Sequence, residues 1–170
     1  MVRKKIFTFW VFFQNHGGYG EDSLCGYEPD VTLNYDKKYP FAETYLSLIK
    51  ESDNAFNELL EYYRSKDEPT MIVMFGDHFP SLDEGFYEEL YGKELDYLEL
   101  EETQLMYQTP FMIWTNYERK SCANLEMSAN YLSSYILREA GLKMPLYNQF
   151  LLNLQEKINI IGMGAICDSD

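Results

Sequence analysis

The chain is short of cysteine and of basic residues, and each shortage argues against a class of protein. Among its 170 residues are three cysteines, Cys25, Cys122 and Cys167, with no Cys-x-x-Cys spacing, so neither a thiolate zinc motif nor a disulfide framework is expected. Its 14 basic residues are outnumbered by 28 acidic ones, and the net charge is −14. Nucleic acid is therefore not an expected partner, because phosphate binding needs a basic surface.

Long apolar runs are also missing. Arg3-Lys4-Lys5 and the apolar residues 6–13 resemble the start of a signal peptide, but the apolar run is short and no small-x-small cleavage site follows it. The run is too short to span a bilayer, so we expect a chain without a membrane span, soluble by itself. Hydrophobic residues make up 46% of the chain and aromatic residues 16%, which predicts a folded domain with a core.

Apolar runs suited to strands alternate with apolar residues at helical spacing, which predicts one α/β domain. A helix is expected over 41–65, where apolar residues recur at helical spacing from Tyr45 to Tyr63. The acidic residues of 83–107 are expected on solvated helical faces, and residues 14–40 in a long surface loop. Strands are expected over 6–13, 70–75 and 111–115, all in one sheet, and a last strand is expected near 158–161. A helix is expected over 128–140, with Ser128 as N-cap and Gly141 as C′ residue, and a short helix near 147–156.

Gly76-Asp77-His78 is the most informative motif, because it directly follows the apolar run 71–75. That run has the length of a buried parallel strand, and ligands gather at the carboxyl ends of such strands. An Asp and a His offer an oxygen and a nitrogen suited to Zn²⁺ or Mn²⁺. A polar turn that only ends the strand is the alternative. His16 similarly follows the expected strand 6–13, so we expect both motifs at one end of the sheet; the alternative for His16 is a cap of its own glycine-rich loop.

Four segments resemble the lipoteichoic acid synthase group of phosphoglycerol transferases, in the sulfatase branch of the alkaline phosphatase superfamily. Residues 15–19 (NHGGY) are similar to the group's N-H-G-P-Y loop, with Gly18 in place of the proline, a change that should loosen the loop. Residues 75–82 (FGDHFPSL) are similar to its GDH-x-P-x-L metal motif, and residues 109–116 (TPFMIWTN) to its TPF-x-I-x-x-N strand. A helix ending in Ala140-Gly141-Leu142 also fits, and the order and spacing of all four agree.

The resemblance implies an alkaline phosphatase/sulfatase-like sheet flanked by helices. Asp77 and His78 would be ligands of a single divalent metal, with Mn²⁺ expected and Mg²⁺ or Zn²⁺ as alternatives, and His16 would contact the phosphoglycerol group. The group's threonine nucleophile and an acidic metal ligand belong to an earlier half of the domain that has no counterpart here. Residues 1–170 are therefore expected to be a C-terminal portion of one catalytic domain, with no catalytic nucleophile and no activity alone.

For the intact enzyme, the resemblance implies metal-dependent transfer of glycerophosphate from phosphatidylglycerol, or a similar anionic lipid headgroup, to a cell-envelope polymer or glycan. The reaction would occur on the extracellular face of a bacterial membrane. The alternatives are a sulfatase or phosphoethanolamine transferase of the same superfamily, or a non-catalytic binding fragment. A partial domain would also expose an apolar face and a sheet edge, which favours self-association.

Overall fold

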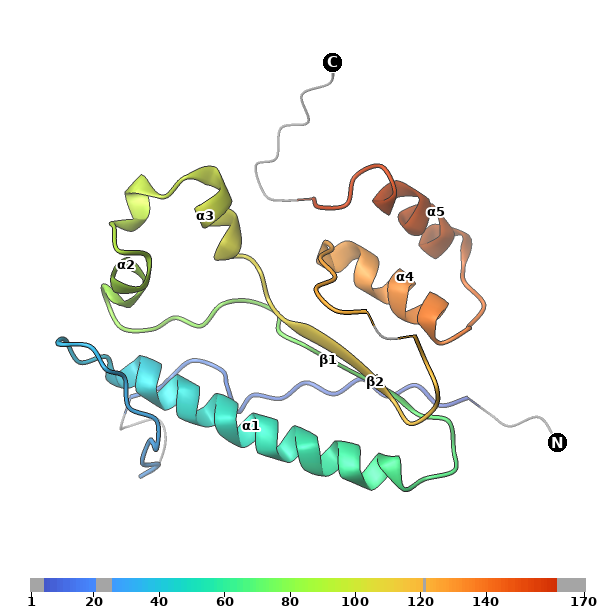
Figure 1. The fold of residues 1–170 in the computed structure, drawn as a ribbon, viewed down its shortest axis with the longest axis horizontal. Helices are drawn as coiled ribbons and strands as arrows, with labels where there is room; N and C mark the ends of the chain where they lie inside the picture. The colour runs from blue at the N-terminus through green and yellow to red at the C-terminus, as the bar shows by residue number, and fades with distance from the viewer. Residues whose placement is uncertain (1–4, 21–25, 121, 162–170) are drawn as a thin grey trace, which may run out of the picture. The chain divides into compact units, whose positions relative to one another are not determined.

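The computed structural model describes residues 5–20, 26–120 and 122–161 (Figure 1). Arg3, Lys4, Cys25, Cys167 and residues 21–24 of the expected loop lie outside this description. The chain divides into two compact units. The first contains the residues up to Glu68 together with Met74–Met112, and the second contains Pro69–Val73 and the residues from Ile113 onward.

Helix α1, Pro40–Arg64, is the longest element of the first unit and confirms the helix expected over 41–65. Pro40 occupies the first helical position, where its missing N–H costs nothing, and Glu43 lies in the first turn, where a negative charge complements the helix dipole. The N–H of Ala42 donates to a carboxylate oxygen of Asp83, 2.9 Å away. A residue 41 positions along the chain therefore caps this helix.

The core of the first unit lies where α1 begins. Tyr39, Ala42 and Phe86 are buried together, and Leu33, Tyr35, Leu82 and Tyr87 pack around them. Phe86 begins the short helix α2, Phe86–Tyr91, which is followed by a 3-10 turn over Leu95–Tyr97 and by α3, Leu100–Leu105. The acidic segment 83–107 is thus largely helical, as expected.

Strands β1, Met71–Phe75, and β2, Phe111–Thr115, pair in a two-stranded sheet and confirm the strands expected over 70–75 and 111–115. Backbone hydrogen bonds join Gly76 to Pro110 and Asn116 to Thr70 at the ends of the pair, a register that makes it antiparallel. The expectation of a buried parallel strand is therefore wrong for β1, whose Phe75 is 46% exposed. The amino end of β2 lies beside the carboxyl end of β1.

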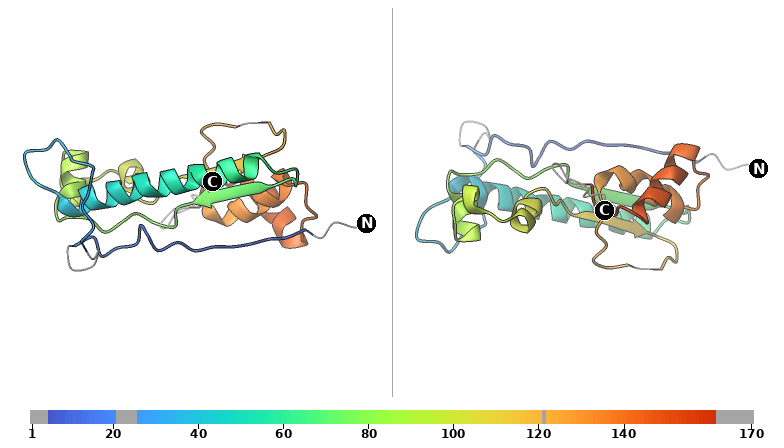
Figure 2. Two further views of the ribbon diagram at one scale, coloured as in Figure 1. Left: turned by 90° about the horizontal axis from the view of Figure 1, so that it is seen from below. Right: turned by 90° about the horizontal axis from the view of Figure 1, so that it is seen from above.

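The expectation of a strand over 6–13 is also wrong. These residues are irregular and exposed, with Ile6 at 89% and Phe7 at 86% exposure. The segment is apolar, but a strand also needs a partner for its backbone hydrogen bonds. The sheet of the described residues contains β1 and β2 alone. Figure 2 shows the segment as an extended trace running lengthwise along α1. The ring of Phe9 lies 6.4 Å from that of Phe75.

The second unit contains the helices α4, Ala129–Glu139, and α5, Leu146–Gln155, which pack against each other and confirm both expected helices. The N–H groups of Gly141 and Leu142 donate to the carbonyls of Arg138 and Leu137, and Gly141 has φ +61°, so α4 ends in a Schellman motif as its glycine predicts.

The strand expected near 158–161 is wrong. The carbonyls of Ile158 and Asn159 accept hydrogen bonds from the Tyr131 hydroxyl and the Ser128 N–H, so the start of α4 satisfies these groups in place of a strand. Within the described ranges, no helix combines the length and the apolar character needed to cross a membrane.

Candidate functional site

Asp77 and His78 form an exposed turn directly after β1. The Oδ2 atom of Asp77 lies 3.7 Å from Nε2 of His78, and the two side chains are 84% and 65% exposed. The His78 N–H donates to Oδ1 of Asp77 at 3.0 Å. Nδ1 of His78 lies 2.7 Å from the carbonyl oxygen of Phe79, which can only accept, so Nδ1 carries a proton and Nε2 is the nitrogen that the neutral ring offers to a ligand.

This donor pair fits a divalent metal ion. Two ligands that each lie ~2.1 Å from one ion are at most ~4.2 Å apart. The 3.7 Å between Oδ2 and Nε2 is within that limit. In the described part of the chain, no three His, Cys, Asp or Glu side chains are grouped to hold a metal, so here the turn offers two donors.

The upstream end of the turn is fixed at Gly76 by the residues that precede β2. The Gly76 N–H donates to the carbonyl of Pro110 at 3.1 Å, and the Thr109 hydroxyl donates to the Gly76 carbonyl at 2.9 Å. A Cβ on residue 76 would lie 3.2 Å from Cβ of Thr109, tighter than an ordinary contact, so a larger residue here requires the backbone to shift. The motif at 109–116 therefore contributes to the site through its first two residues, a role that its sequence does not reveal.

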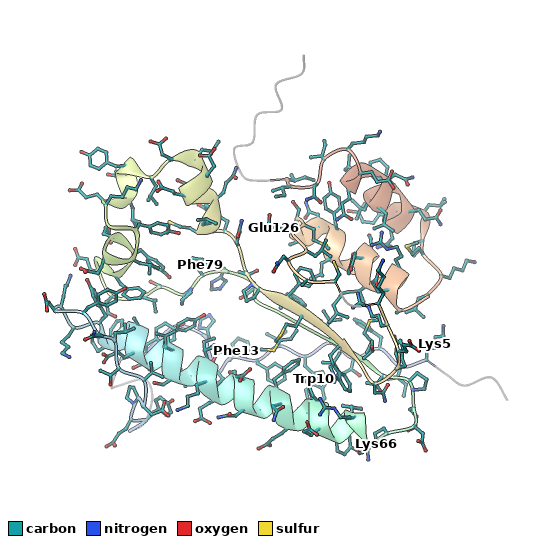
Figure 3. All side chains as sticks on the ribbon, in the orientation of Figure 1. Lys5, Trp10, Phe13, Lys66, Phe79 and Glu126 are labelled. Carbon is teal, nitrogen blue, oxygen red and sulfur yellow. The ribbon has the colours of Figure 1, made fainter. Side chains whose placement is uncertain are left out.

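The downstream end of the turn is fixed by Tyr87 of α2. The Tyr87 hydroxyl donates to the Pro80 carbonyl at 2.6 Å, and the rings of Tyr87 and Phe79 are stacked with centroids 6.1 Å apart. Burial raises the pKa of Tyr87 to about 12, so the phenol remains a neutral donor at any physiological pH. Figure 3 shows Phe79 on the segment that joins β1 to α2.

The loop of His16 is held to α1. Asn15 accepts two hydrogen bonds, one to its carbonyl from the Tyr19 hydroxyl (2.7 Å) and one to Oδ1 from the hydroxyl of Ser52 on α1 (3.0 Å). His16 is exposed, its N–H donates to the Phe13 carbonyl at 3.0 Å, and its ring lies 6.0 Å from the ring of Phe13. The imidazole is thus presented at the surface by an anchored loop.

Gly18 uses the conformational freedom that glycine provides. Its φ is +106°, in the region that favours glycine, whereas proline is confined to φ near −65°. The proline that the resemblance leads one to expect at this position is therefore incompatible with the loop as it is built here.

Tyr19 joins the His16 loop to α1 through the ring of Tyr45. Tyr19, from the His16 loop, is buried, with its ring edge-on to Tyr45 of α1 at 5.7 Å. The phenols of Tyr45 and Tyr19 contribute, after burial, to the raised pKa of Tyr87, which holds the Asp77–His78 turn. The meeting of His16 with Asp77 and His78 stays a prediction. The sequence identified Tyr45 as part of an apolar helix face and contained no signal for Tyr87.

Comparison with known proteins places the chain in a family. A family model described as Sulfatase matches residues 2–142. A protein of Rhizobium meliloti (strain 1021), named for cyclic beta-1,2-glucan modification, is 27% identical over an alignment of 168 residues that covers 94% of this chain and 26% of that protein. The solved structure of Streptococcus pyogenes phosphoglycerol transferase GacH in complex with sn-glycerol-1-phosphate matches with a TM-score of 0.67 at 19% identity, covering 92% of this chain and 37% of the transferase.

These matches agree with the α/β fold and with the resemblance carried by the Asp77–His78 turn and the His16 loop. The chain spans about a quarter of the Rhizobium protein and little more than a third of the transferase. The family match covers most of the chain, including both motif loops and α4. The chain therefore belongs to the sulfatase family, in the alkaline phosphatase superfamily.

Proposed function

We propose that this chain contributes the metal-binding turn, Asp77 and His78, of a phosphoglycerol transferase. The transferase would move glycerophosphate from phosphatidylglycerol, or a similar lipid headgroup, to a cell-envelope polymer or glycan. The observation that carries the proposal is the pair of donors after β1, with Oδ2 of Asp77 and Nε2 of His78 3.7 Å apart and both exposed. The fold shared with a transferase that binds glycerol phosphate supports the substrate class. The reaction would take place on the extracellular face of a bacterial membrane.

Each residue has a role in this proposal. A divalent ion, with Mn²⁺ expected, would stabilise negative charge on the phosphoryl oxygens. Asp77 would supply an oxygen ligand and His78 a neutral nitrogen ligand, with its other nitrogen kept protonated by the Phe79 carbonyl. The exposed imidazole of His16 would contact the phosphoglycerol group. We assign no nucleophile to these residues, and we propose that the 170-residue chain alone binds Mn²⁺ weakly and transfers nothing.

The family match carries a second candidate, hydrolysis of a sulfate ester by the same turn. The two candidates differ in the substrate that is consumed. The protein as its gene encodes it would be incubated with Mn²⁺ and either phosphatidylglycerol labelled in its headgroup or an aryl sulfate. Release of labelled glycerophosphate supports the transferase, and release of sulfate alone identifies a sulfatase.

Variants of the turn test the metal assignment. Asp77→Ala and His78→Ala should each abolish calorimetric Mn²⁺ binding together with turnover, because each removes a ligand. Asp96→Ala, which removes an exposed carboxylate from the 3-10 turn, is the matched control and should change neither. Full turnover by Asp77→Ala would overturn the assignment.

A further inference from the structure

We propose that Thr109 and Tyr87 are positioning residues that hold the Asp77–His78 turn from its two ends and so set the geometry of its two donors. The inference rests on the proposed function only in taking the turn as a metal site. Neither residue bears a metal ligand, and each acts through the backbone of the turn.

Exposure of the two donor side chains makes the backbone decisive. Asp77 is 84% and His78 65% exposed, and each is oriented by a hydrogen bond to the backbone of the turn, because Oδ1 of Asp77 accepts the His78 N–H and Nδ1 of His78 donates to the Phe79 carbonyl. The distance between their donor atoms therefore depends on the path of the main chain from Gly76 to Pro80. Groups that fix this path act as outer-shell supports of a metal site, where loss of a support typically weakens metal binding ~10–100-fold.

Thr109 fixes the peptide bond that enters Asp77. The carbonyl of Gly76 belongs to that peptide, and it accepts the Thr109 hydroxyl at 2.9 Å. The N–H on the other side of Gly76 is held by the carbonyl of Pro110 at 3.1 Å. Because both polar groups of Gly76 are engaged, the plane of the Gly76–Asp77 peptide is set, and with it the direction in which the Asp77 side chain leaves the backbone.

Tyr87 fixes the segment that orients the imidazole. His78 directs Nδ1 at the Phe79 carbonyl, so the position of that carbonyl determines where Nε2 points. Tyr87 stacks on the Phe79 ring and donates its hydroxyl to the Pro80 carbonyl at 2.6 Å, which holds the residue on each side of the Phe79–Pro80 peptide bond. Loss of this hydroxyl releases the Pro80 carbonyl, and with it the adjoining Phe79–Pro80 peptide, whose Phe79 carbonyl selects the His78 tautomer.

The chain offers a matched control for each test variant. Thr109→Val and Tyr87→Phe remove one hydroxyl each and keep side-chain shape. Thr115→Val removes a threonine hydroxyl at the far end of β2 that donates to the Tyr117 carbonyl at 2.8 Å. Tyr131→Phe removes a tyrosine hydroxyl that donates to the Ile158 carbonyl at 2.7 Å. Thr109→Ser retains the hydroxyl and serves as the conservative rescue.

The experiment is a calorimetric Mn²⁺ titration of the protein as its gene encodes it, together with ¹⁵N NMR of the His78 ring without metal. We expect Thr109→Val and Tyr87→Phe to weaken Mn²⁺ binding at least ~10-fold, and Thr109→Ser and both controls to stay within about twofold of the unsubstituted protein. Tyr87→Phe should also mix the two tautomers of His78, whereas Tyr131→Phe should leave Nδ1 protonated.

Three results are distinguishable. Unchanged affinity and an unchanged tautomer in Thr109→Val and Tyr87→Phe would overturn the inference. An equal loss in the two controls would also overturn it, because the effect would then be one of general stability. If the unsubstituted protein binds no Mn²⁺ and releases no glycerophosphate, the proposed function fails, and the His78 tautomer in Tyr87→Phe still decides whether Tyr87 positions the ring.

Discussion

Gly76→Ala tests the close approach that holds the candidate metal turn. A Cβ on residue 76 would lie 3.2 Å from Cβ of Thr109, 3.6 Å from its Cγ2 and 3.9 Å from Cδ of Pro110. The first distance is shorter than an ordinary van der Waals contact, so the backbone of 76 or of 109 must shift by a few tenths of an ångström. Such a shift stretches the hydrogen bond from the Thr109 hydroxyl to the Gly76 carbonyl.

The magnitude follows from opposing terms. Overpacking of a well-fitted site costs ~1–3 kcal/mol, and weakening one hydrogen bond costs up to ~1 kcal/mol. Replacing glycine by alanine reduces the entropy of the unfolded chain and returns ~0.4–1 kcal/mol. We therefore expect Gly76→Ala to lower the free energy of unfolding by ~1–2 kcal/mol.

Urea unfolding followed by circular dichroism measures this change. The control is Gly17→Ala, because a Cβ on Gly17 meets nothing within 4 Å, so the entropy term acts alone and the variant should be ~0.4–1 kcal/mol more stable than the parent. In a Thr109→Gly background, which removes the colliding Cβ, Gly76→Ala should lose its cost. If Gly76→Ala is as stable as Gly17→Ala, the approach of Thr109 to the turn is not as close as described.

Four further predictions concern the first unit. Ser47→Ala should lower the free energy of unfolding by ~1–2 kcal/mol in urea titrations, because the buried hydroxyl accepts two loop N–H groups and donates to a helix carbonyl. Gly18→Pro should destabilise the loop more than Gly18→Ala, since φ +106° is closed to proline; amide hydrogen exchange of the loop reports it. Burial raises the pKa of Tyr87 to about 12, so the contribution of the neutral phenol to stability is complete below pH ~10 and is lost as the pH rises toward 12. The change in pKa corresponds to ~2.7 kcal/mol for a fully buried group, and to about 1 kcal/mol once solvent screening is included. Tyr87→Phe should therefore flatten the fall in the free energy of unfolding between pH 9 and 11.5. The exposed apolar residues of 6–13 should make the 170-residue chain self-associate, and Phe12→Asp should lower the sedimentation coefficient at high concentration, an unchanged value counting against this surface.

Elements with strong local signals could be predicted from the sequence. The apolar period from Tyr45 to Tyr63 located α1, and the proline-led run 111–115 located β2 with its observed ends. Gly141 located the end of α4, because the left-handed conformation required by a Schellman motif favours glycine. In each case the information lies within a few residues of the element itself.

The segment 6–13 could not be predicted in the same way. Its apolar residues satisfy one requirement of a buried strand, but the second requirement, a neighbouring strand for the backbone, is a property of the rest of the structure. The antiparallel pairing of β1 with β2 was missed for a similar reason, because the strand sequences do not encode the direction of a partner.

In the candidate site, the donor residues have local sequence signals and the residues that support them do not. Asp77, His78 and His16 could be proposed from the sequence because their residue types follow apolar runs in recognisable motifs. The residues that hold them were not found, because Tyr87 lies in an acidic helical segment and Thr109 precedes a strand without any pattern that connects it to Gly76. The role of Thr109 depends on a hydrogen bond to a residue more than 30 positions away, Gly76. The role of Tyr87 depends in part on the stacking of its ring on that of Phe79.

The contacts that orient the two donors all belong to the first unit. Thr109, Pro110 and Tyr87 lie in the same compact unit as Asp77 and His78. Preorganisation of the turn therefore requires that unit to be folded, and it does not require the hydrogen bonds of α4 or α5. A substitution such as Tyr131→Phe in the second unit can lower stability without moving the donors, whereas Tyr87→Phe changes their geometry at a smaller cost in stability. Metal affinity and stability should thus vary independently across these variants, which is the signature expected of positioning residues.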